Sequence, residues 1–280
     1  MSLRRVCALI AVVDSDTLKV TWEGQERLVR LMDVDPERSA LGGGKPATEF
    51  GRLTLRWARQ TVYADVDSVE IQFPTDKLEY SNSGMLLCYV DVRGDNYNVR
   101  LVREGWSPCF EKYGRPRLHR EAMEKAELWA RVEGRGIWGG RGGRGDYGAL
   151  KDYWRIRAGQ IDDYRQAIAL GEDILDSRLQ YDEIENRAQN DTDGQVFAEL
   201  ARSYHQDDGA VSIQLGGPRQ PLDAYFPKSA RALALFLERE YVGFGKPNYL
   251  FFNGRLSING ENPQIVIDRL DQVRTFPTRT

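Results

Sequence analysis

The sequence predicts a mainly β protein with helices, in which two small β-barrels are joined by a helical connector. Short segments rich in β-branched and aromatic residues recur through both halves of the 280-residue chain, and turns rich in glycine, asparagine and aspartate separate them. In each half, three such segments precede a helix and two follow it. The chain is also longer than one small domain usually is, so two domains are expected.

The first half contains predicted strands with a helix inserted among them. The strands cover residues 6–13, 17–22, 26–32, 69–73 and 85–92. Apolar periodicity predicts helices over 48–59, 98–104 and 118–133, and a glycine-rich loop at 42–46 precedes the first of them. Five strands with an inserted helix and terminal helices are typical of an OB-type barrel, and we place this domain at 1–138.

A linker and a helical connector are expected after the first barrel. The segment GGRGGRGDYG is rich in glycine and predicts a linker over 139–150. Its RGG triplets are also typical of RNA-binding tails, although a plain linker is the favoured interpretation. A connector over 151–190 follows, with predicted helices at 152–170 and 171–187. The apolar stripe expected to be core consists of Trp154, Ile161, Tyr164 and Ile168.

The last part of the chain, 191–280, repeats the strand pattern of the first half without a visible sequence repeat. Its predicted strands cover 196–203, 210–215, 222–226, 249–258 and 264–273, and a predicted helix covers 229–238. A second OB-like barrel is therefore expected. A base-stacking platform is one interpretation of four aromatic residues in these strands, Tyr225, Phe226, Phe251 and Phe252. The other is the barrel core, which is the more typical place for aromatic residues of barrel strands.

Composition excludes several classes of protein. Hydrophobic residues make up 41% and charged residues 29%, which fits a soluble globular chain, and no run of 18 apolar residues is present to span a membrane. The apolar stretch 7–13 ends at an acidic turn, so it predicts a strand rather than a signal peptide. The compartment stays open between a bacterial cytoplasm and export.

Cysteine and histidine are too scarce to build the commoner metal and nucleophile sites. The three cysteines, Cys7, Cys88 and Cys109, include no CxxC pair, which argues against a disulfide framework and a zinc site. Cys7 and Cys88 lie in apolar strands, where buried thiols are expected. The two histidines do not support a Ser-His-Asp site, and His119 is expected to be a solvated residue of a charged helix.

Charge is distributed unevenly along the chain, although the net charge is only −3. Residues 112–144 include nine basic and four acidic residues, a local excess that suits a phosphate backbone. A solvated loop and an amphipathic helix would have the same composition, so both interpretations stay open. The candidates for stacking on and gripping a nucleotide are Lys112, Tyr113, Arg115 and Arg117, with Lys77 as a further basic residue.

Three aspartates and an arginine form the group with the clearest chemistry. Asp14 and Asp16 flank a strand turn, and Asp35 ends a strand expected beside it. Carboxylates gathered at strand ends repel one another unless a cation joins them, and their hard oxygens suit Ca²⁺ or Mg²⁺. A nearby Arg30 would grip a phosphate, which completes the groups that water attack on a phosphodiester requires. Turn-forming aspartates and an Arg30–Asp35 ion pair are the structural alternatives.

Several ordered motifs over about residues 5–138 resemble the staphylococcal nuclease family. They are VVDSDTLKV, VRLMDVDPE, TEFGRLTLRWA, SGMLLCYVDV, NYNVRLVREGW and a helix ending in GRGIW. The glycine-rich loop before Pro46 is similar to that of a bacterial branch of the family. The resemblance implies an OB barrel, a calcium ion as cofactor, and hydrolysis of phosphodiester bonds in DNA or RNA.

The resemblance also implies roles for the residues that match the family's motifs. Asp16 corresponds to the first calcium carboxylate of a DGDT turn, and Asp35 corresponds to the second. Asp14 corresponds to the acid behind them, and Arg30 to the first phosphate-binding arginine. Glu37 is the candidate for the glutamate that activates water.

Two positions depart from the family's pattern. The family reads D-x-P-E where this chain reads DPER at 35–38, so either Glu37 is displaced by one residue or Arg38 occupies the position of the base. Met85 stands where a second phosphate-binding arginine belongs, and a thioether has no charge. Loss of one such group typically costs about 10²–10³ in rate. The candidates for a replacement charge are Arg93 and Lys77.

Two functions therefore stand as alternatives. The first is weak calcium-dependent hydrolysis of nucleic acid, with single-stranded DNA or RNA as the partner. The second is a catalytically degenerate module that binds single-stranded nucleic acid or a protein. Neither function involves a membrane.

Overall fold

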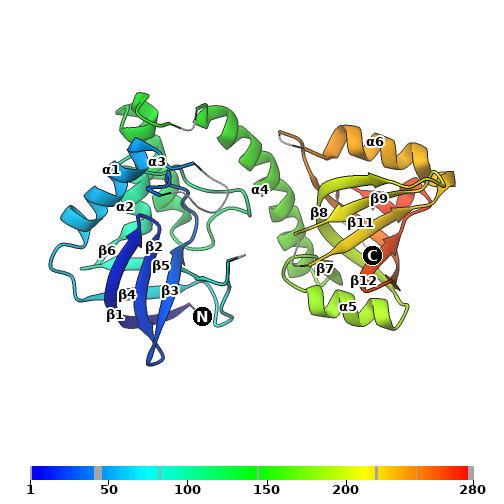
Figure 1. Ribbon diagram of the computed structural model, residues 1–280, viewed down its shortest axis with the longest axis horizontal. Helices are drawn as coiled ribbons and strands as arrows, with labels where there is room; N and C mark the ends of the chain where they lie inside the picture. The colour runs from blue at the N-terminus through cyan, green and yellow to red at the C-terminus, as the bar shows by residue number, and fades with distance from the viewer. Residues whose placement is uncertain are drawn as a thin grey trace. The chain divides into compact units, whose positions relative to one another are not determined.

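The computed structural model describes residues 2–40, 46–81, 83–143, 145–217, 220–243 and 245–276. The chain divides into two compact units, the first comprising Met1–Glu111 and Arg115–Lys151, the second Lys112–Gly114 and Asp152–Thr280. Within the described residues, each unit contains a closed five-stranded β-barrel with helices around it (Figure 1). The predicted fold class is thereby confirmed.

The first barrel closes through a pair of parallel strands. Its strands are β1 (Leu3–Asp14), β2 (Thr17–Trp22), β3 (Gln25–Leu31), β4 (Ser68–Phe73) and β5 (Leu86–Val92), and the short β6 (Asp95–Asn96) extends one edge. Neighbours follow the order β3-β2-β1-β4-β5 with antiparallel pairing. Strand β3 then pairs in parallel with β5, with Arg30 opposite Leu87, and this pairing completes the barrel.

Inward-facing side chains of these strands form the core of the first unit. Leu18, Val29 and Ile71 are fully buried, as expected from strands that present alternate residues to the interior. The prediction that Cys7 and Cys88 are core thiols is confirmed, and Cys109 is buried as well.

Helices α1 (Glu49–Trp57), α2 (Tyr97–Arg103) and α3 (Arg120–Val132) gather at one end of the first barrel (Figure 1). Helix α1 begins at Thr48, whose hydroxyl accepts a hydrogen bond from the Gly51 amide, and it continues as the π-helical turn η1 (Ala58–Val62). The short 3₁₀ helix η2 (Gly136–Gly139) follows α3.

The environment of His119 differs from the solvated surface expected for it. His119 precedes α3 in a left-handed conformation, and its half-buried ring lies 5.3 Å from the ring of Tyr89, centroid to centroid. Its Nε2 atom lies 2.9 Å from the side-chain amide of Gln72. The expectation failed because helix periodicity does not indicate where the residue before the helix points.

The second barrel has the same pairing scheme as the first. Its strands are β8 (Asp193–His205), β9 (Val211–Leu215), β10 (Leu222–Phe226), β11 (Tyr249–Asn259) and β12 (Asn262–Val266). Antiparallel pairing of β8 with β11 and parallel pairing of β10 with β12 close it. Strands β7 (Ile174–Asp176) and β13 (Val273–Arg274) extend its edges. A second OB-like barrel is therefore present although no sequence repeat reveals it.

Helix α4 (Tyr147–Ala169) begins in the first unit and ends in the second. Its first turns are held by Lys151, which is buried and donates to the Glu111 carboxylate at 2.6 Å. The division between the units falls after this lysine. The assignment of 139–150 to a linker and 151–190 to a connector stays a prediction.

Helix α5 (Tyr181–Gln189) and helix α6 (Arg231–Tyr241), which follows η3 (Lys228–Ala230), lie on opposite sides of the second barrel (Figure 1). The helix predicted at 171–187 is wrong in its first part, because Ile174–Asp176 pair with β8 instead. The strand predicted at 264–273 is also wrong beyond Val266, where the 3₁₀ helix η4 (Leu270–Gln272) intervenes.

The aromatic residues of the second barrel belong mainly to its interior. Phe226, Phe251 and Phe252 are buried, so the core interpretation is confirmed for them, whereas Tyr225 is partly exposed. In the predicted stripe of α4, Trp154, Ile161 and Tyr164 are buried, but Ile168 is exposed near the end of the helix. No helix in the described part of the chain combines the length and apolarity that crossing a membrane requires.

Candidate active site

The tight turn between β1 and β2 carries the first two aspartates of the candidate site. Asp14 pairs with Thr17 across the turn, and the Asp16 carbonyl accepts a hydrogen bond from the Leu31 amide at 2.9 Å. The hydroxyl of Tyr97 on α2 donates to the Ser15 carbonyl at 2.8 Å. These contacts fix the turn between a strand and a helix, and Asp16 is consequently only 1% exposed.

Arg30 reaches the turn because of the register of the sheet. Thr17 lies opposite Arg30 in the β2–β3 pair, so the guanidinium extends beside Asp16. Its Nη2 atom lies 2.9 Å from Asp16 Oδ2, yet the direction of the N–H does not satisfy a hydrogen bond. The contact is therefore an ion pair by distance, and the buried Oδ2 accepts no hydrogen bond from the described residues.

Arg38 also contacts both aspartates of the turn. Its Nη1 atom lies 3.2 Å from Asp16 Oδ1 and 3.4 Å from Asp14 Oδ2. Asp16 Oδ1 accepts a further hydrogen bond from the Thr17 hydroxyl at 2.8 Å. The carboxylate of Asp16 therefore lies between two guanidinium groups, one from β3 and one from the loop after it.

Asp35 is buried in that same loop. Its backbone amide donates to the Ser107 hydroxyl at 2.8 Å, and its neighbour Val34 forms a bridge with Cys109. Asp35 is 2% exposed, which confines its carboxylate to the protein interior.

Glu37 is held by segments that follow it in the chain. Its Oε1 atom accepts hydrogen bonds from the Gly143 amide at 2.7 Å and from the Tyr147 hydroxyl at 2.6 Å. Its Oε2 atom accepts one from the hydroxyl of Thr48, the residue that caps α1. Glu37 is 1% exposed, so these donors fix the carboxylate firmly in place. Thr48, Gly143 and Tyr147 were not predicted as partners of the site.

The fit of a calcium ion depends on the aspartate oxygens. Asp16 Oδ2 is a buried carboxylate oxygen that accepts no hydrogen bond, although Arg30 lies 2.9 Å from it, and a hard divalent cation coordinates oxygens of this type. The Asp16 carboxylate therefore suits the ion chemically, and the parts of Asp35 and Asp14 stay predictions. Among the residues that the structure describes, however, no three acidic, histidine or cysteine side chains are arranged to hold a metal.

Met85 precedes β5 and has only an apolar side chain to offer. A turn holds it, in which the Ser81 amide donates to the Met85 carbonyl at 2.8 Å. Arg93 cannot replace the missing charge, because it follows the opposite end of β5, about 25 Å away at the rise of a strand. The Arg93 guanidinium instead donates to the carbonyls of Ala64 and Asp65 at 2.8 Å.

The predicted nucleic-acid-binding residues do not all belong to one unit. Lys77, which is exposed, lies in the first unit with Arg115 and Arg117, and Arg117 pairs with Glu79 at 2.6 Å. Lys112 and Tyr113 belong to the second unit. There the Lys112 ammonium lies 5.4 Å from the centroid of the Tyr113 ring. Their role in nucleic-acid binding stays a prediction.

A buried arginine explains why Lys112 belongs to the second unit. Arg157 on α4 is fully buried, and its Nε atom donates to the Lys112 carbonyl at 3.0 Å. Its guanidinium also forms a two-point contact with Glu199, at 2.8 and 2.9 Å. Burial by itself would raise the pKa of Glu199, but the hydrogen bonds and charge of Arg157 outweigh it and hold that pKa low. The network is structural and is already saturated with partners.

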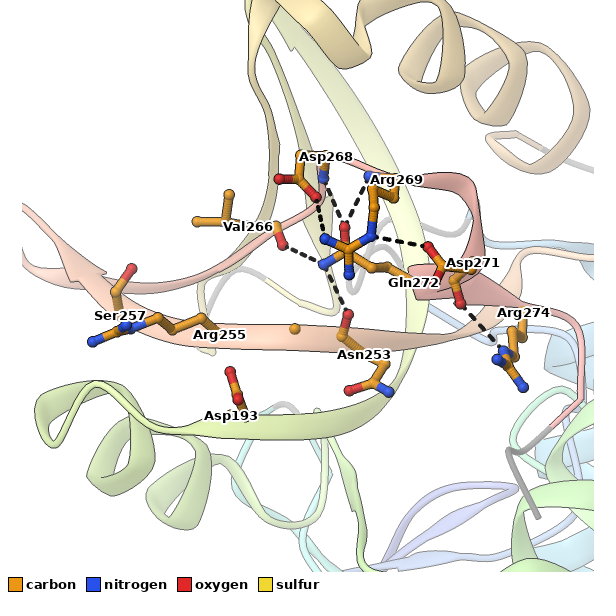
Figure 2. Close-up of a pocket in the computed structure, with 11 residues that line it drawn as sticks. Asp193, Asn253, Arg255, Ser257, Val266, Asp268, Arg269, Asp271, Gln272 and Arg274 are labelled. Atoms are coloured by element: carbon orange, nitrogen blue, oxygen red, sulfur yellow. Dashed lines mark hydrogen bonds and ion pairs between the residues drawn. The ribbon is translucent and has the colours of Figure 1, made fainter. Parts of the chain in front are cut away.

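The second unit also has a polar groove of about 480 Å³ beside β11 (Figure 2). Its charged side chains have both signs, and Arg269 pairs with Asp268 and Asp271 at 3.3 Å each. Gln272 fills its centre, where its side chain accepts from the Asp268 and Arg269 amides and donates to backbone carbonyls. Three aspartates and three arginines line the groove, so its charged side chains sum to zero and give no preference for a ligand of either sign.

Comparison with known proteins gives the first unit its family. The model of the staphylococcal nuclease homologue family matches residues 28–140. The thermonuclease of Staphylococcus intermedius is 30% identical over 138 residues, which are 45% of this chain and 72% of that protein. The thermonuclease of Staphylococcus hyicus is 26% identical over 137 residues, which are 46% of this chain and 73% of that protein.

This chain belongs to the staphylococcal nuclease family. The resemblance inferred from the motifs is confirmed, and membership supports nucleic-acid hydrolysis in general terms. Apart from Lys112–Gly114, the residues that the family model matches lie within the first unit, which we call the nuclease-family unit. The second barrel lies outside the match. In the nuclease-family unit, Arg30 contacts Asp16, and Arg38 contacts both Asp14 and Asp16. The roles expected for Asp14, Asp16, Asp35 and Arg30 stay predictions.

Proposed function

We propose that the nuclease-family unit hydrolyses phosphodiester bonds in nucleic acid at the site around Asp16. The observation that carries this proposal is the contact of Arg30 with Asp16, 2.9 Å between charged atoms at the rim of a closed barrel. The Arg30 side chain remains 22% exposed, so its outer N–H groups can reach a ligand. Asp16 is buried beneath Arg30, so its carboxylate is placed to bind an ion and is not exposed to solvent.

Each residue has a role that its position supports. Arg30 would bind a phosphate oxygen, because a guanidinium offers paired donors to phosphate. Asp16 and Asp35 would hold the ion, and Asp14 would add charge behind them. A bound calcium ion would neutralise phosphate charge and polarise water. Glu37 would orient that water through its carboxylate, which the Thr48 hydroxyl holds at Oε2.

The expected activity is weak. Met85 offers no charge to the transition state, and the absence of one such donor typically lowers the rate about 10²–10³-fold. The hydrogen bonds from Gly143 and Tyr147 also hold Glu37 in one orientation. Both features act on turnover and leave phosphate binding by Arg30 intact.

The test is cleavage of fluorescent single-stranded DNA and RNA by the full chain in excess calcium chloride. The wild type should cleave slowly, and chelation of calcium should stop it. Asp16→Asn should abolish cleavage and Arg30→Gln should slow it about 10²–10³-fold, whereas Arg52→Gln should leave the rate unchanged. Arg52 is a suitable control because its exposed side chain pairs with Glu49 on α1. Intact substrate with the wild type, together with cleavage by Met85→Arg, would contradict the proposal for the native chain.

A second candidate function is binding of single-stranded nucleic acid, or of a protein, without turnover. Met85 and the engaged carboxylate of Glu37 favour it, because both weaken catalysis more than binding. Binding to phosphates predicts that the fluorescence anisotropy of a labelled oligonucleotide rises with protein and falls with added salt. Salt-dependent binding without cleavage in calcium would select this function. If the oligonucleotide does not bind even at low salt, the nucleic-acid version of this second function is excluded and binding of a protein remains.

A further inference from the structure

Arg38 is the least expected charge in the candidate site. Its Nη1 atom contacts Asp16 Oδ1 at 3.2 Å and Asp14 Oδ2 at 3.4 Å, while Arg30 contacts Asp16 from the other side. Asp16 is 1% exposed and the Arg38 side chain 15% exposed. The Asp16 carboxylate thus has one guanidinium beside each of its oxygens, Arg38 at Oδ1 and Arg30 at Oδ2.

The fold fixes Arg38 at this position. Its carbonyl accepts a hydrogen bond from the Thr48 amide at 3.0 Å, and it forms a bridge with Ala47. Gly51 permits this approach, because a Cβ atom there would lie 2.1 Å from the Arg38 carbonyl oxygen. The backbone of Arg38 is therefore locked against the start of α1. Its side chain is a built-in part of the site and not a mobile surface group.

We propose that Arg38 is an internal cation that competes with a divalent metal ion for Asp16, so that the ion binds this site more weakly than its acids alone would allow. The inference rests on the proposed function in taking Asp16 as an ion ligand. It goes further in proposing that Arg38 lowers the affinity of the site for the ion, and this follows from the contacts of Arg38 with Asp16 and Asp14.

Electrostatics supports the competition. A divalent ion on Asp16 would lie within about 5 Å of a guanidinium that contacts the same carboxylate, and like charges at this separation repel strongly outside bulk water. Screening by salt is weak over such a distance. Binding is weakened and not blocked, because Arg38 contacts Asp16 Oδ1, whereas Oδ2 accepts no hydrogen bond and has its 2.9 Å contact with Arg30, the residue proposed to bind the phosphate.

Asp14 gives the displaced guanidinium a second partner. Its Oδ2 atom already lies 3.4 Å from the same Nη1 atom, so Arg38 can keep an ion pair when a metal ion occupies Asp16. Asp14 itself is anchored, because its Oδ1 atom accepts from the Ser15 amide at 2.8 Å. The exchange of partners therefore needs only a small movement of the Arg38 side chain.

The experiment is a titration of the full chain with calcium chloride, followed by the amide NMR signals of residues 14–17. Arg38→Gln removes the charge at similar length and should lower the dissociation constant by at least about tenfold. Arg38→Lys keeps the charge and should stay within about threefold of the wild type. Arg52→Gln removes an exposed charge from α1 and should change nothing, and Asp16→Asn should abolish binding.

The outcomes separate this inference from the proposed function. Equal affinity of the wild type and Arg38→Gln, with binding lost in Asp16→Asn, would overturn the competition and leave the ion site standing. Absence of calcium binding in both the wild type and Arg38→Gln would overturn the inference together with the calcium requirement of the proposed function. Nucleic-acid cleavage measured separately would then show whether the hydrolytic function survives.

A measurement on the wild type covers the case in which Arg38→Gln does not fold. Saturating calcium should shift the Nε–Hε signal of Arg38, because the guanidinium leaves Asp16, and should leave the corresponding signal of Arg52 in place. An Arg38 signal that does not respond while the amides of residues 14–17 do would overturn the competition.

Discussion

The hydroxyl of Tyr147 lies 2.6 Å from Oε1 of Glu37, across 110 residues of sequence. The same oxygen accepts a hydrogen bond from the Gly143 amide at 2.7 Å. Tyr147 is the first residue of α4, so the carboxylate that follows Asp35 and Pro36 also fixes the start of that helix. One acid therefore connects the loop after β3, the cap of α1 and the segment that leaves the nuclease-family unit.

Tyr147→Phe should destabilise the nuclease-family unit. The change removes one hydrogen bond to a buried carboxylate and leaves the ring in place, so the free energy of unfolding should fall by about 1–3 kcal/mol. Hydrogen exchange of the amides around Gly143 and at the start of α4 measures the loss locally. Tyr80→Phe, on an exposed tyrosine, is the control. Unchanged exchange at these amides would show that the contact contributes nothing.

Thr48 performs two tasks with one hydroxyl. It accepts from the Gly51 amide at 2.9 Å as the cap of α1, and it donates to Glu37. Thr48→Val removes both hydrogen bonds and keeps the shape of the side chain. The free energy of unfolding should fall by about 2 kcal/mol or more, because loss of a helix cap alone lowers it by about 1 kcal/mol. Thr48→Ser keeps the hydroxyl and should retain most of the stability. Thermal unfolding that ranks serine no better than valine would refute the assignment.

Met85→Arg should raise turnover. The substitution restores a guanidinium at the start of β5, where the family has one, and a restored transition-state donor is worth about 10²–10³ in kcat. Rates on single-stranded DNA in calcium chloride measure the gain. Ser83→Arg places the same charge on an exposed neighbour and separates position from net charge. A similar gain from both variants would mean that charge alone is responsible.

His119 should make stability depend on pH below neutrality. Burial lowers its pKa from the ordinary value of 6.5, because the folded protein disfavours the charged ring. When the side-chain amide nitrogen of Gln72 faces the imidazole of His119, it donates a hydrogen bond to Nε2 at 2.9 Å. A ring nitrogen that accepts a hydrogen bond belongs to neutral imidazole. The unfolded chain therefore binds the proton first as the pH falls, and stability decreases from about pH 6.5 down to the folded pKa.

Melting temperatures measured between pH 7 and pH 5 test this dependence. His119→Gln should flatten the part of the pH profile that lies below 6.5. A variant whose melting temperature falls as steeply as that of the wild type over this range would assign the pH dependence to other groups.

The strands of the first barrel could be predicted from local pattern, whereas the ion pair considered from the sequence was Arg30–Asp35 and Arg30 instead contacts Asp16. Alternating apolar residues fix which face of β2 and β3 is buried, and the tight turn then sets Thr17 opposite Arg30. The second barrel was predictable from the order of its strands and its helix. Strand β7 was not, because three residues, Ile174–Asp176, form a strand only through their pairing with β8.

The contacts of Arg38 and Glu37 could not be predicted from the sequence. The missing residue in the DPER segment was visible, but its effect on the direction of each side chain depends on how the loop packs against α1. The one local signal was Gly51 inside a helix, a position that glycine destabilises unless another backbone approaches closely. The partners of Glu37 at 143 and 147 lie more than a hundred residues away.

The most direct test of the central claim compares the initial rates at which the wild type and Arg30→Gln cleave single-stranded DNA in calcium chloride. The site described around Asp16 predicts slow cleavage by the wild type and a loss of about 10²–10³-fold in the variant, with Arg52→Gln unchanged. Equal rates for the wild type and Arg30→Gln would contradict it, because cleavage would then arise away from this site.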